Sequence, residues 1–282
     1  MTMSNRSVAV VTGAAGAIGT EICRRLQARG YAVLAADLDP AALDALQTRL
    51  ALPLTTVAGD LTDPQTIERI RDTLETRFGR CDVLINNAGT VITDPFEQMT
   101  PATVRREVEV NQLAPMLLTH ALFGLLQARH GQVISVVSLG SMLPLAESPG
   151  YAASKFGLRG FMLSLALRTP HNGVRISTVN PAGVDTPMLH HEARSGGSPL
   201  NFLGTPLQPA QVAERVIRQL SRPKIENDIS ASDGWLIRIA MLFPNLYAKV
   251  LPLLTALGEK GRQKFLQKIG PAASHPEHSR DP

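Results

Sequence analysis

Short runs of consecutive apolar, often β-branched residues alternate along the chain with longer segments whose apolar residues recur at helical spacing. The runs predict strands at residues 8–12, 31–36, 54–58, 82–86, 132–138 and 174–179. The longer segments predict helices at residues 18–29, 64–78, 101–111, 114–129, 151–169 and 208–220, and another helix opens at Asp39-Pro40. Several strands are apolar at neighbouring positions, as burial on both faces of a sheet requires.

This alternation predicts parallel strands that are joined by right-handed crossovers, with helices on both faces of the sheet. We therefore expect the α/β fold class: a Rossmann-like, doubly wound parallel sheet in three αβα layers, with a C-terminal helical extension. The pattern shows no boundary before residue 222. We expect one domain over residues 1–222, an extension over residues 223–269 and a disordered tail over residues 270–282. Residues 224–232 are the candidate for a seventh strand.

Composition narrows the classes of function. Of the 282 residues, 44% are hydrophobic and 18% are charged, which excludes an intrinsically disordered chain. The net charge of +4 comes from dispersed basic residues, and aromatic residues make up only 4%, so no nucleic-acid partner is expected. Cys23 and Cys81 form no metal or disulfide motif, and the chain begins without the features of a signal peptide. These features predict reduced thiols in a soluble, cytoplasmic protein.

A glycine-rich run, Thr12-Gly-Ala-Ala-Gly-Ala-Ile-Gly19, joins the first strand to the first helix. Small residues there let backbone N–H groups approach a pyrophosphate, and the N-terminus of the next helix favours its negative charge. Asp37 ends the second strand, where a carboxylate can accept both ribose hydroxyls of an adenosine and repels a 2′-phosphate. Together these features predict a dinucleotide site for NAD, with NADP less favoured. The alternatives are an ordinary tight turn and a helix cap, although Asp39 is better placed for the cap.

Tyr151 and Lys155 lie four residues apart at the start of a predicted helix and therefore share one of its faces. A nearby ammonium and an oxidised nicotinamide would both lower the pKa of a tyrosine from its usual ~10, so the phenol could exchange a proton with an alcohol or a carbonyl. Ser138 ends the fifth strand and could hold that oxygen by a hydrogen bond. Ser141 is a rival, whereas Ser135 is expected to lie buried in the strand. A solvated helix face is the alternative for the Tyr–Lys pair.

These motifs occur together in a known family. Tyr151-Ala-Ala-Ser-Lys155 resembles the YxxxK motif of the short-chain dehydrogenase/reductase superfamily. Asn86-Asn-Ala-Gly89, Asp60-Leu61 and Asn180-Pro-Ala-Gly-Val-Asp-Thr186 are similar to other motifs of that family, in the same order, over residues 7–222. The resemblance implies an oxidoreductase that uses a nicotinamide cofactor.

The resemblance also implies residue roles. Ser138, Tyr151, Lys155 and Asn111 would be catalytic, with Asn111 fixing a water that links Lys155 to solvent. The implied cofactor contacts lie in the glycine-rich run and at the strand ends: Gly13, Ala15, Gly16, Ala17, Ile18, Gly19, Asp37, Asp60, Leu61, Asn87, Ala88, Gly89, Tyr151, Lys155, Pro181, Gly183, Val184 and Thr186. The chain departs from the family at Ala17, which replaces the second glycine of TGxxxGxG, and Ala15 lacks the basic character common in NADP-using members. A homodimer or homotetramer packed through the helices at 114–129 and 151–169 is implied as well.

Apolar residues follow Ser138 and the sixth strand. They predict a pocket for a small hydrophobic alcohol or ketone, with substrate contacts at Ser138, Met142, Leu143, Tyr151 and Met188; ordinary packing beneath a loop is the alternative. Residues 187–207 lie where the family has a mobile lid, here with a hinge at Gly196-Gly197. His190 and His191 have no further candidate ligands, so no metal site is expected and both are interpreted as exposed lid residues.

The extension is apolar over residues 235–257, but two prolines and two cations interrupt it, so we do not expect it to span a membrane. A pocket cover or an oligomer contact is favoured over a peripheral membrane contact, which the cationic, amphipathic residues 259–268 would permit. The sequence thus predicts an NAD-dependent oxidoreductase that transfers hydride between the nicotinamide and a secondary alcohol or ketone. The alternatives are an NADPH-dependent carbonyl reductase, a dinucleotide-sensing protein without turnover, and a membrane-attached lipid reductase.

Overall fold

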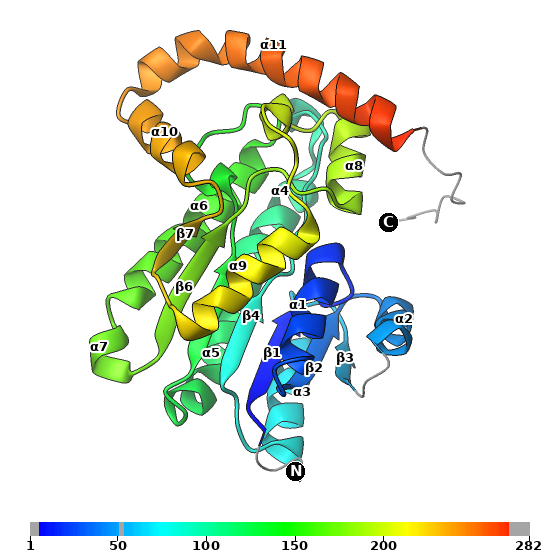
Figure 1. Cartoon of the computed structure of the whole chain (residues 1–282), viewed down its shortest axis with the longest axis vertical. Helices are drawn as coiled ribbons and strands as arrows, with labels where there is room; N and C mark the ends of the chain where they lie inside the picture. Colours follow the sequence, from blue (N-terminus) through cyan, green and yellow to red (C-terminus); the bar gives the residue numbers. More distant parts are fainter. Residues whose placement is uncertain (1–5, 51–53, 271–282) are drawn as a thin grey trace.

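The computed structural model describes residues 6–50 and 54–270 and contains one seven-stranded parallel sheet in the order β3-β2-β1-β4-β5-β6-β7 (Figure 1). Parallel pairing of all neighbouring strands confirms the predicted α/β class and the doubly wound sheet. The strands are β1 (Val8–Thr12), β2 (Ala32–Asp37), β3 (Thr55–Ala58), β4 (Val83–Asn86), β5 (Gln132–Val136), β6 (Arg175–Asn180) and β7 (Glu226–Asp228).

Helices connect the strands and extend the chain beyond the last one. The α-helices are α1 (Ala17–Gln27), α2 (Pro40–Leu50), α3 (Pro64–Arg77), α4 (Pro101–Val108), α5 (Ala114–Gln127), α6 (Pro149–Ala166), α7 (Thr169–Asn172), α8 (Pro187–Ser195), α9 (Pro209–Ser221), α10 (Ala231–Met241) and α11 (Pro244–Ile269). Short helical turns are η2 (Phe96–Gln98), η3 (Glu109–Leu113), η4 (Leu139–Ser141) and η5 (Pro199–Phe202).

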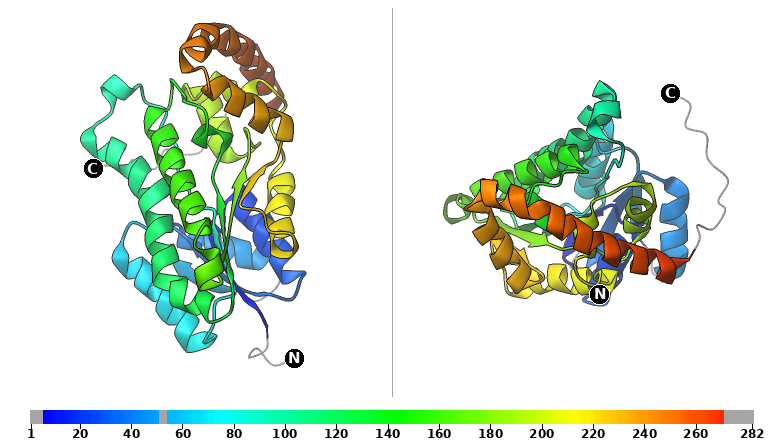
Figure 2. Two further views of the ribbon diagram at one scale, coloured as in Figure 1. Left: turned by 90° about the vertical axis from the view of Figure 1, so that its left-hand side faces the viewer. Right: turned by 90° about the horizontal axis from the view of Figure 1, so that it is seen from above.

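The sheet builds a hydrophobic core on each face, because successive side chains of a strand point to opposite sides. Ala9 and Val11 of β1 belong to a core with α1, α2 and α9. Val8 and Val10 belong to the other core, with α3, α5 and α6. Figure 2 shows these two helical layers on either side of the sheet. The layers explain why the strands are apolar at neighbouring positions.

The helices predicted at residues 101–111 and 114–129 are not separate. Helix α4 passes through the π-helical turn η3 directly into α5. The predicted break between two helices is wrong, because the wider π-helical turn accommodates one additional residue without ending the helix. Turns of this kind often occur at functional sites, and η3 carries the fully buried Asn111.

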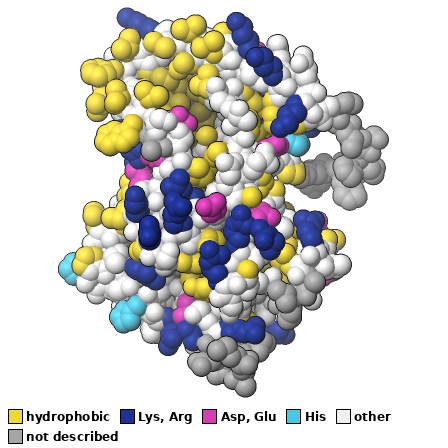
Figure 3. Space-filling model, viewed as in Figure 1, with side chains coloured by type: hydrophobic (Ala, Val, Ile, Leu, Met, Phe, Trp, Pro, Cys, Tyr) yellow, Lys and Arg dark blue, Asp and Glu magenta, His cyan; other side chains and the backbone are white. Residues whose placement is uncertain are grey.

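Strand β7 pairs in parallel with β6, so the sheet continues beyond residue 222, where the sequence suggested that the first domain ends. It confirms the seventh strand expected within residues 224–232. Beyond it, the extension is helical, and α11 continues through Pro252 although the sequence suggested an interruption there. Hydrophobic side chains gather over α10 and α11 on the face that Figure 3 shows. Of the predicted tail, residues 271–282 lie outside the described residues.

Among the described residues, none of the helices has the length and apolar character that crossing a membrane requires.

Candidate active site

Hydrogen bonds join the glycine-rich loop between β1 and α1 to the loop that follows β4. Thr12 Oγ1 accepts hydrogen bonds from the backbone N–H groups of Asn87 and Ala88, at 3.0 and 3.1 Å. Asn87 Nδ2 donates to the carbonyl oxygen of Gly13 at 3.0 Å. Gly13 has a φ of +59°, and a Cβ on Gly19 would lie 2.0 Å from the Gly13 oxygen. Both positions therefore require glycine.

The start of α1 is a place where a negative group can bind. Its N-cap is Gly16, no side chain caps the helix, and its first turn, which begins at Ala17, has no acidic residue. The N–H groups of that turn and the helix dipole favour an anion. This donor set fits the pyrophosphate of a nicotinamide dinucleotide, and Gly16 at the cap takes the position that the family pattern led us to expect at residue 17.

Two carboxylates lie at the ends of β2 and β3, as predicted, but both have protein partners. Asp37 accepts hydrogen bonds from the backbone N–H groups of Ala15 and Leu38, each at 2.8 Å. Asp60 forms an ion pair with Arg106 at 2.7 Å. Asp37 therefore holds the glycine-rich loop in position, a role that the sequence analysis did not anticipate.

A cavity of about 140 Å³ lies beside the carboxyl ends of β4, β5 and β6. Ser138, Tyr151 and Lys155, which are far apart in the sequence, all line it. The predicted cofactor residues that line it with Tyr151 and Lys155 are Ile18, Asn87, Gly89, Pro181, Gly183, Val184 and Thr186. Of the other predicted substrate residues only Met188 lines this cavity; Met142 is buried in the protein, and Leu145 is part of the wall instead of Leu143.

Tyr151 and Lys155 face the cavity from the first turns of α6. The Lys155 Nζ lies 5.6 Å from the centre of the Tyr151 ring. A Cβ on Gly140 would lie 3.2 Å from Ser138 Oγ and 3.5 Å from Tyr151 Cε1, so hydroxyl and ring are close together. Ser141 donates its hydroxyl to the backbone oxygen of Ser138 at 2.6 Å and is thereby used inside the turn. Ser138 is the serine of this turn that lines the cavity.

Asn111 lies close to the same cavity, at the π turn. Its Oδ1 accepts from the Thr90 N–H at 2.8 Å, and its Nδ2 donates to the Thr90 oxygen at 2.9 Å and to Ser154 Oγ at 3.1 Å. A Cβ on Gly89 would lie 3.1 Å from Asn111 Oδ1 and 3.4 Å from Lys155 Nζ. The side-chain amide of Asn111 and the ammonium of Lys155 therefore both lie next to Gly89. A water relay through Asn111 stays a prediction.

Burial controls the protonation of Tyr151. Desolvation raises the pKa of this phenol above its usual value, and the carboxylates of Glu192 and Glu107 raise it further, against a lowering effect of the Ser138 hydroxyl. Burial also lowers the pKa of Lys155 to about 8. Without a coenzyme the net shift of the Tyr151 pKa is therefore upward. The expected lowering by Lys155 together with an oxidised nicotinamide stays a prediction.

Two carboxyl groups near Tyr151, those of Glu192 and Glu107, were not predicted from the sequence. Glu192 lines the cavity from α8 and accepts a hydrogen bond from Asn201 Nδ2 at 3.0 Å; burial raises its pKa to about 7. Glu107 is fully buried on α4, where it accepts from the Ile92 N–H at 3.0 Å, and burial raises its pKa as well. Glu107 lies on a predicted helix and Glu192 in the predicted lid segment, and a charged residue in either place is typical of a solvated surface, so neither position carried a signal.

His190 is not an exposed lid residue as predicted. Its Nε2 lies 2.7 Å from Asp185 Oδ1, and its ring packs edge-on against Phe265 of α11, with 5.5 Å between ring centres. His191 is exposed, as expected. Gly196 ends α8 with a φ of +100°, at the expected hinge. In residues 6–50 and 54–270, no cluster of His, Cys, Asp or Glu is placed to hold a metal ion.

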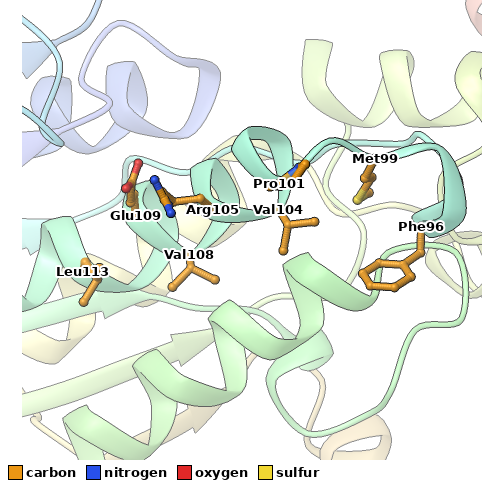
Figure 4. A pocket seen from close by; sticks show the side chains of 8 residues that line it. All are labelled: Phe96, Met99, Pro101, Val104, Arg105, Val108, Glu109 and Leu113. Carbon is orange, nitrogen blue, oxygen red and sulfur yellow. The ribbon is translucent and has the colours of Figure 1, made fainter.

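A larger cavity of about 660 Å³ lies elsewhere, along η2, α4 and η3 (Figure 4). Most of its lining is apolar: Phe96, Met99, Pro101, Val104, Val108 and Leu113, with Arg105 and Glu109. None of the predicted catalytic residues reaches it. We therefore place the candidate active site in the smaller cavity.

The doubly wound parallel sheet, with Ser138, Tyr151 and Lys155 in a cavity at the carboxyl ends of its strands, defines the class of Rossmann-like α/β proteins. A family model described as short chain dehydrogenase matches residues 7–195. The chain therefore belongs to the short-chain dehydrogenase/reductase family, as the sequence motifs indicated.

Individual relatives cover different shares of the chain. Retinol dehydrogenase 5 of Mus musculus is 34% identical over 186 residues, which are 65% of this chain and 58% of the relative. The 1-deoxy-11-beta-hydroxypentalenate dehydrogenase of Streptomyces exfoliatus is 36% identical over 191 residues, 64% of this chain and 68% of the relative. A crystal structure of a family oxidoreductase from Burkholderia thailandensis has a TM-score of 0.68 and 30% identity, over 80% of this chain and 91% of that one. The match thus spans less than two thirds of the retinol dehydrogenase.

Replacing Glu192 with Gln tests the buried carboxyl. Folding raises its pKa from the usual 4.5 to about 7, so between these values the native state holds a proton that the unfolded chain releases. The free energy of unfolding therefore falls as pH rises through this window. The Glu192→Gln variant, which resembles the protonated acid, should match the unaltered chain near pH ~4, below both pKa values, and exceed its stability by roughly 3 kcal/mol near pH ~8. Urea denaturation at both pH values measures the difference.

Glu214→Gln is the control, because this carboxylate on α9 has an exposed fraction of 69%. It should leave the pH dependence as it is. Parallel pH curves for Glu192→Gln and the unaltered chain would contradict the assignment.

Proposed function

We propose that this chain is an NAD-dependent dehydrogenase that interconverts a hydrophobic secondary alcohol and its ketone. The observation that carries the proposal is the meeting of Ser138, Tyr151 and Lys155 in one cavity, beside the glycine-rich loop of a short-chain dehydrogenase. A nicotinamide coenzyme held at this site would supply the hydride chemistry, as acceptor from the alcohol or donor to the ketone. The protein binds and orients both molecules and moves the proton.

Tyr151 exchanges that proton. Because its pKa is raised, the phenol is protonated at neutral pH and can donate to a ketone oxygen as the alcohol forms. In the opposite direction it must accept the alcohol proton, and the charges of Lys155 and of an oxidised coenzyme favour the phenolate. The Ser138 hydroxyl, beside the ring, donates a hydrogen bond that holds the substrate oxygen.

Lys155 has two tasks in this scheme. With a pKa of about 8 it is still largely protonated at neutral pH and stabilises the phenolate in the cavity. Its ammonium lies beside Gly89 and Asn111 and is therefore placed to pass a proton toward a water held at the π turn.

Asp37 decides the choice of coenzyme. Its carboxylate is fixed at the end of β2 by the N–H groups of Ala15 and Leu38, next to the start of α1. A fixed negative charge repels a 2′-phosphate, and Ala15 supplies no cation that would attract it. We therefore propose NAD as the coenzyme, with the NADPH-dependent reductase as the rival.

The walls of the cavity favour a hydrophobic substrate. Val137, Leu145, Met188 and Leu189 line the side beyond Ser138 and Tyr151. Two relatives are named as dehydrogenases of retinol and of 1-deoxy-11-beta-hydroxypentalenate, which supports an apolar alcohol. The buried, unpaired Cys23 and Cys81 support a location in the reducing cytoplasm.

We also propose that two copies of the chain pair through α5 and α6. Three large apolar side chains on or beside these helices are exposed: Leu113 at 41%, Leu117 at 53% and Phe156 at 37%. The apolar cavity of Figure 4 adjoins them at Leu113. A surface of this composition is typical of a contact between copies.

Replacing Tyr151 with Phe removes the group that exchanges the proton. Turnover of a ketone or alcohol should fall by roughly 10²- to 10⁴-fold, while the coenzyme still binds. The absorbance of the reduced coenzyme, followed with a panel of lipophilic alcohols and ketones, measures turnover, and fluorescence titration measures binding. Tyr31→Phe is the control, because this half-buried tyrosine lies outside the cavity. Undiminished turnover by Tyr151→Phe would refute the mechanism.

Asp37→Asn removes the charge at the end of β2 but keeps an oxygen that can accept from Ala15. The ratio of kcat/KM with NADP to that with NAD should rise about tenfold, which corresponds to ~1.4 kcal/mol of lost repulsion. Asp39→Asn is the matched control, since Asp39 caps α2 through the Ala41 N–H at 2.8 Å. If Asp37→Asn leaves the ratio unchanged, the charge of Asp37 does not select the coenzyme.

Leu117→Glu places a charge on the proposed contact between copies. The variant should be monomeric in light scattering at a concentration where the unaltered chain forms a dimer or tetramer, because an ionised carboxylate resists burial. Leu38→Glu, at a position that is 60% exposed near α2, should keep the assembly. An unchanged mass for Leu117→Glu would place the contact elsewhere.

A further inference from the structure

The outer surface of α10 and of the first half of α11 carries half of the large apolar side chains that the described residues leave exposed. On α10 and the turn after it these are Trp235, Leu236, Ile239, Leu242 and Phe243, which are 53 to 71% exposed. Figure 3 shows the hydrophobic side chains gathered over these helices. We call this surface, within residues 235–257, the apolar face. Exposed apolar patches of this extent mark interaction sites.

On α11 the apolar face is a single stripe. Leu246, Val250, Leu253 and Leu257 are 39 to 62% exposed. Their separations of four, three and four residues place all of them on one side of the helix.

An adjoining side of α11, about 100° around the helix from the stripe, packs against the rest of the protein. The Tyr247 hydroxyl donates to the Pro144 oxygen at 3.1 Å, and the rings of Phe265 and Phe202 lie 5.3 Å apart. A Cβ on Gly258 would lie 2.2 Å from a backbone oxygen of η5. The helix thus packs closely on α8 and η5 and leaves its apolar stripe exposed.

The same side of α11 becomes cationic beyond the stripe. Lys260, Lys264 and Lys268 are exposed and continue the helical spacing of the leucines. The one acidic residue of the helix, Glu259, pairs with Arg262 at 2.7 Å. The lysine row therefore has no carboxylate on its own helix to neutralise it.

We propose that the apolar face and the lysine row together dock on the surface of a bilayer that contains anionic lipid. Leucine, phenylalanine and tryptophan side chains enter the boundary between headgroups and acyl chains, and the lysines contact the anionic headgroups. Helix α11 has 26 residues and is about 39 Å long, so it lies along the surface with both parts of its outer side in contact.

A second copy of the chain fits this surface less well. Two copies related by a twofold axis present the same surface to each other. Overlap along the whole of α11 would set each lysine row against the leucines or the lysines of the partner. Either arrangement buries ammonium groups without a counter-charge, whereas anionic headgroups supply one.

Docking also places the candidate cavity near the membrane. Glu192 and Leu189 of α8 and Asn201 of η5 line that cavity, and α11 packs on both elements. A hydrophobic substrate could then enter from the lipid. This consequence rests on the proposed function, but docking itself does not.

The chain contains its own probe of docking, since Trp235 is its one tryptophan and is 67% exposed on the apolar face. The intact chain is mixed with vesicles of phosphatidylcholine, alone or with about one third phosphatidylglycerol. We expect it to sediment with the mixed vesicles and its emission to move to shorter wavelength. Binding should be about tenfold weaker to phosphatidylcholine alone and should weaken as salt is added.

Matched variants separate the two parts of the surface. Leu253→Glu combined with Leu257→Glu should lower binding to both kinds of vesicle about tenfold or more. Lys260→Gln, Lys264→Gln and Lys268→Gln together should abolish the preference for phosphatidylglycerol. Leu167→Glu is the control, because this residue is 74% exposed at the end of α6, outside the apolar face. Thermal unfolding by circular dichroism verifies that each variant is folded.

Two results would overturn the proposal. One is that the unaltered chain stays in solution with mixed vesicles and its emission does not move. The other is that Leu253→Glu with Leu257→Glu reduces the mass of the particle in light scattering without changing sedimentation, which would make this face a contact between copies. Turnover of a water-soluble substrate, measured without vesicles, should be the same in these variants, so a failure of docking is distinguishable from a failure of the proposed activity.

Discussion

The candidate site depends on burying a phenol and an ammonium in the same small cavity. Burial works against charge on both groups: it raises the pKa of Tyr151 and lowers that of Lys155 to about 8. Glu192 and Glu107 add to the cost of a phenolate. Without a coenzyme, Tyr151 therefore keeps its proton, and a further positive charge beside the ring is needed before that proton can leave. A coenzyme whose oxidised ring is cationic supplies such a charge, which would couple coenzyme binding to proton transfer.

The rest of the fold brings these groups together and holds them there. Parallel strands put the loops after β1, β4, β5 and β6 at one edge of the sheet. Thr12 and Asn87 fasten the first two of these loops to each other, and the π turn directs Asn111 toward Lys155 past Gly89. Helix α11 then packs on α8 and η5, through Phe265 against His190 and Phe202. Each of these contacts joins segments that are distant in sequence.

The sequence predicted the parts of this arrangement that depend on local patterns. Strands buried on both faces are apolar at neighbouring positions, and a motif such as Tyr151-Ala-Ala-Ser-Lys155 has a spacing that identifies it. Properties set by distant contacts were not predictable in the same way. Nothing in the sequence shows that the fold buries Glu192 and Glu107, and nothing shows the burial of Tyr151 that raises the pKa of its phenol. The π turn could not be predicted from the sequence, because one added residue inside a helix does not alter the composition of that helix. His190 was misjudged for the same reason, since its partners Asp185 and Phe265 meet it only in the folded chain.

The central claim is the protonation of Tyr151, and the chain allows it to be measured directly because it has only three tyrosines. In a variant with Tyr31→Phe and Tyr247→Phe, ultraviolet absorbance of the tyrosinate reports Tyr151 alone. We expect the pKa of Tyr151 to lie above the ordinary ~10 without coenzyme and to fall clearly when NAD is added. A pKa below that value in the free enzyme, or one that NAD does not change, would contradict it.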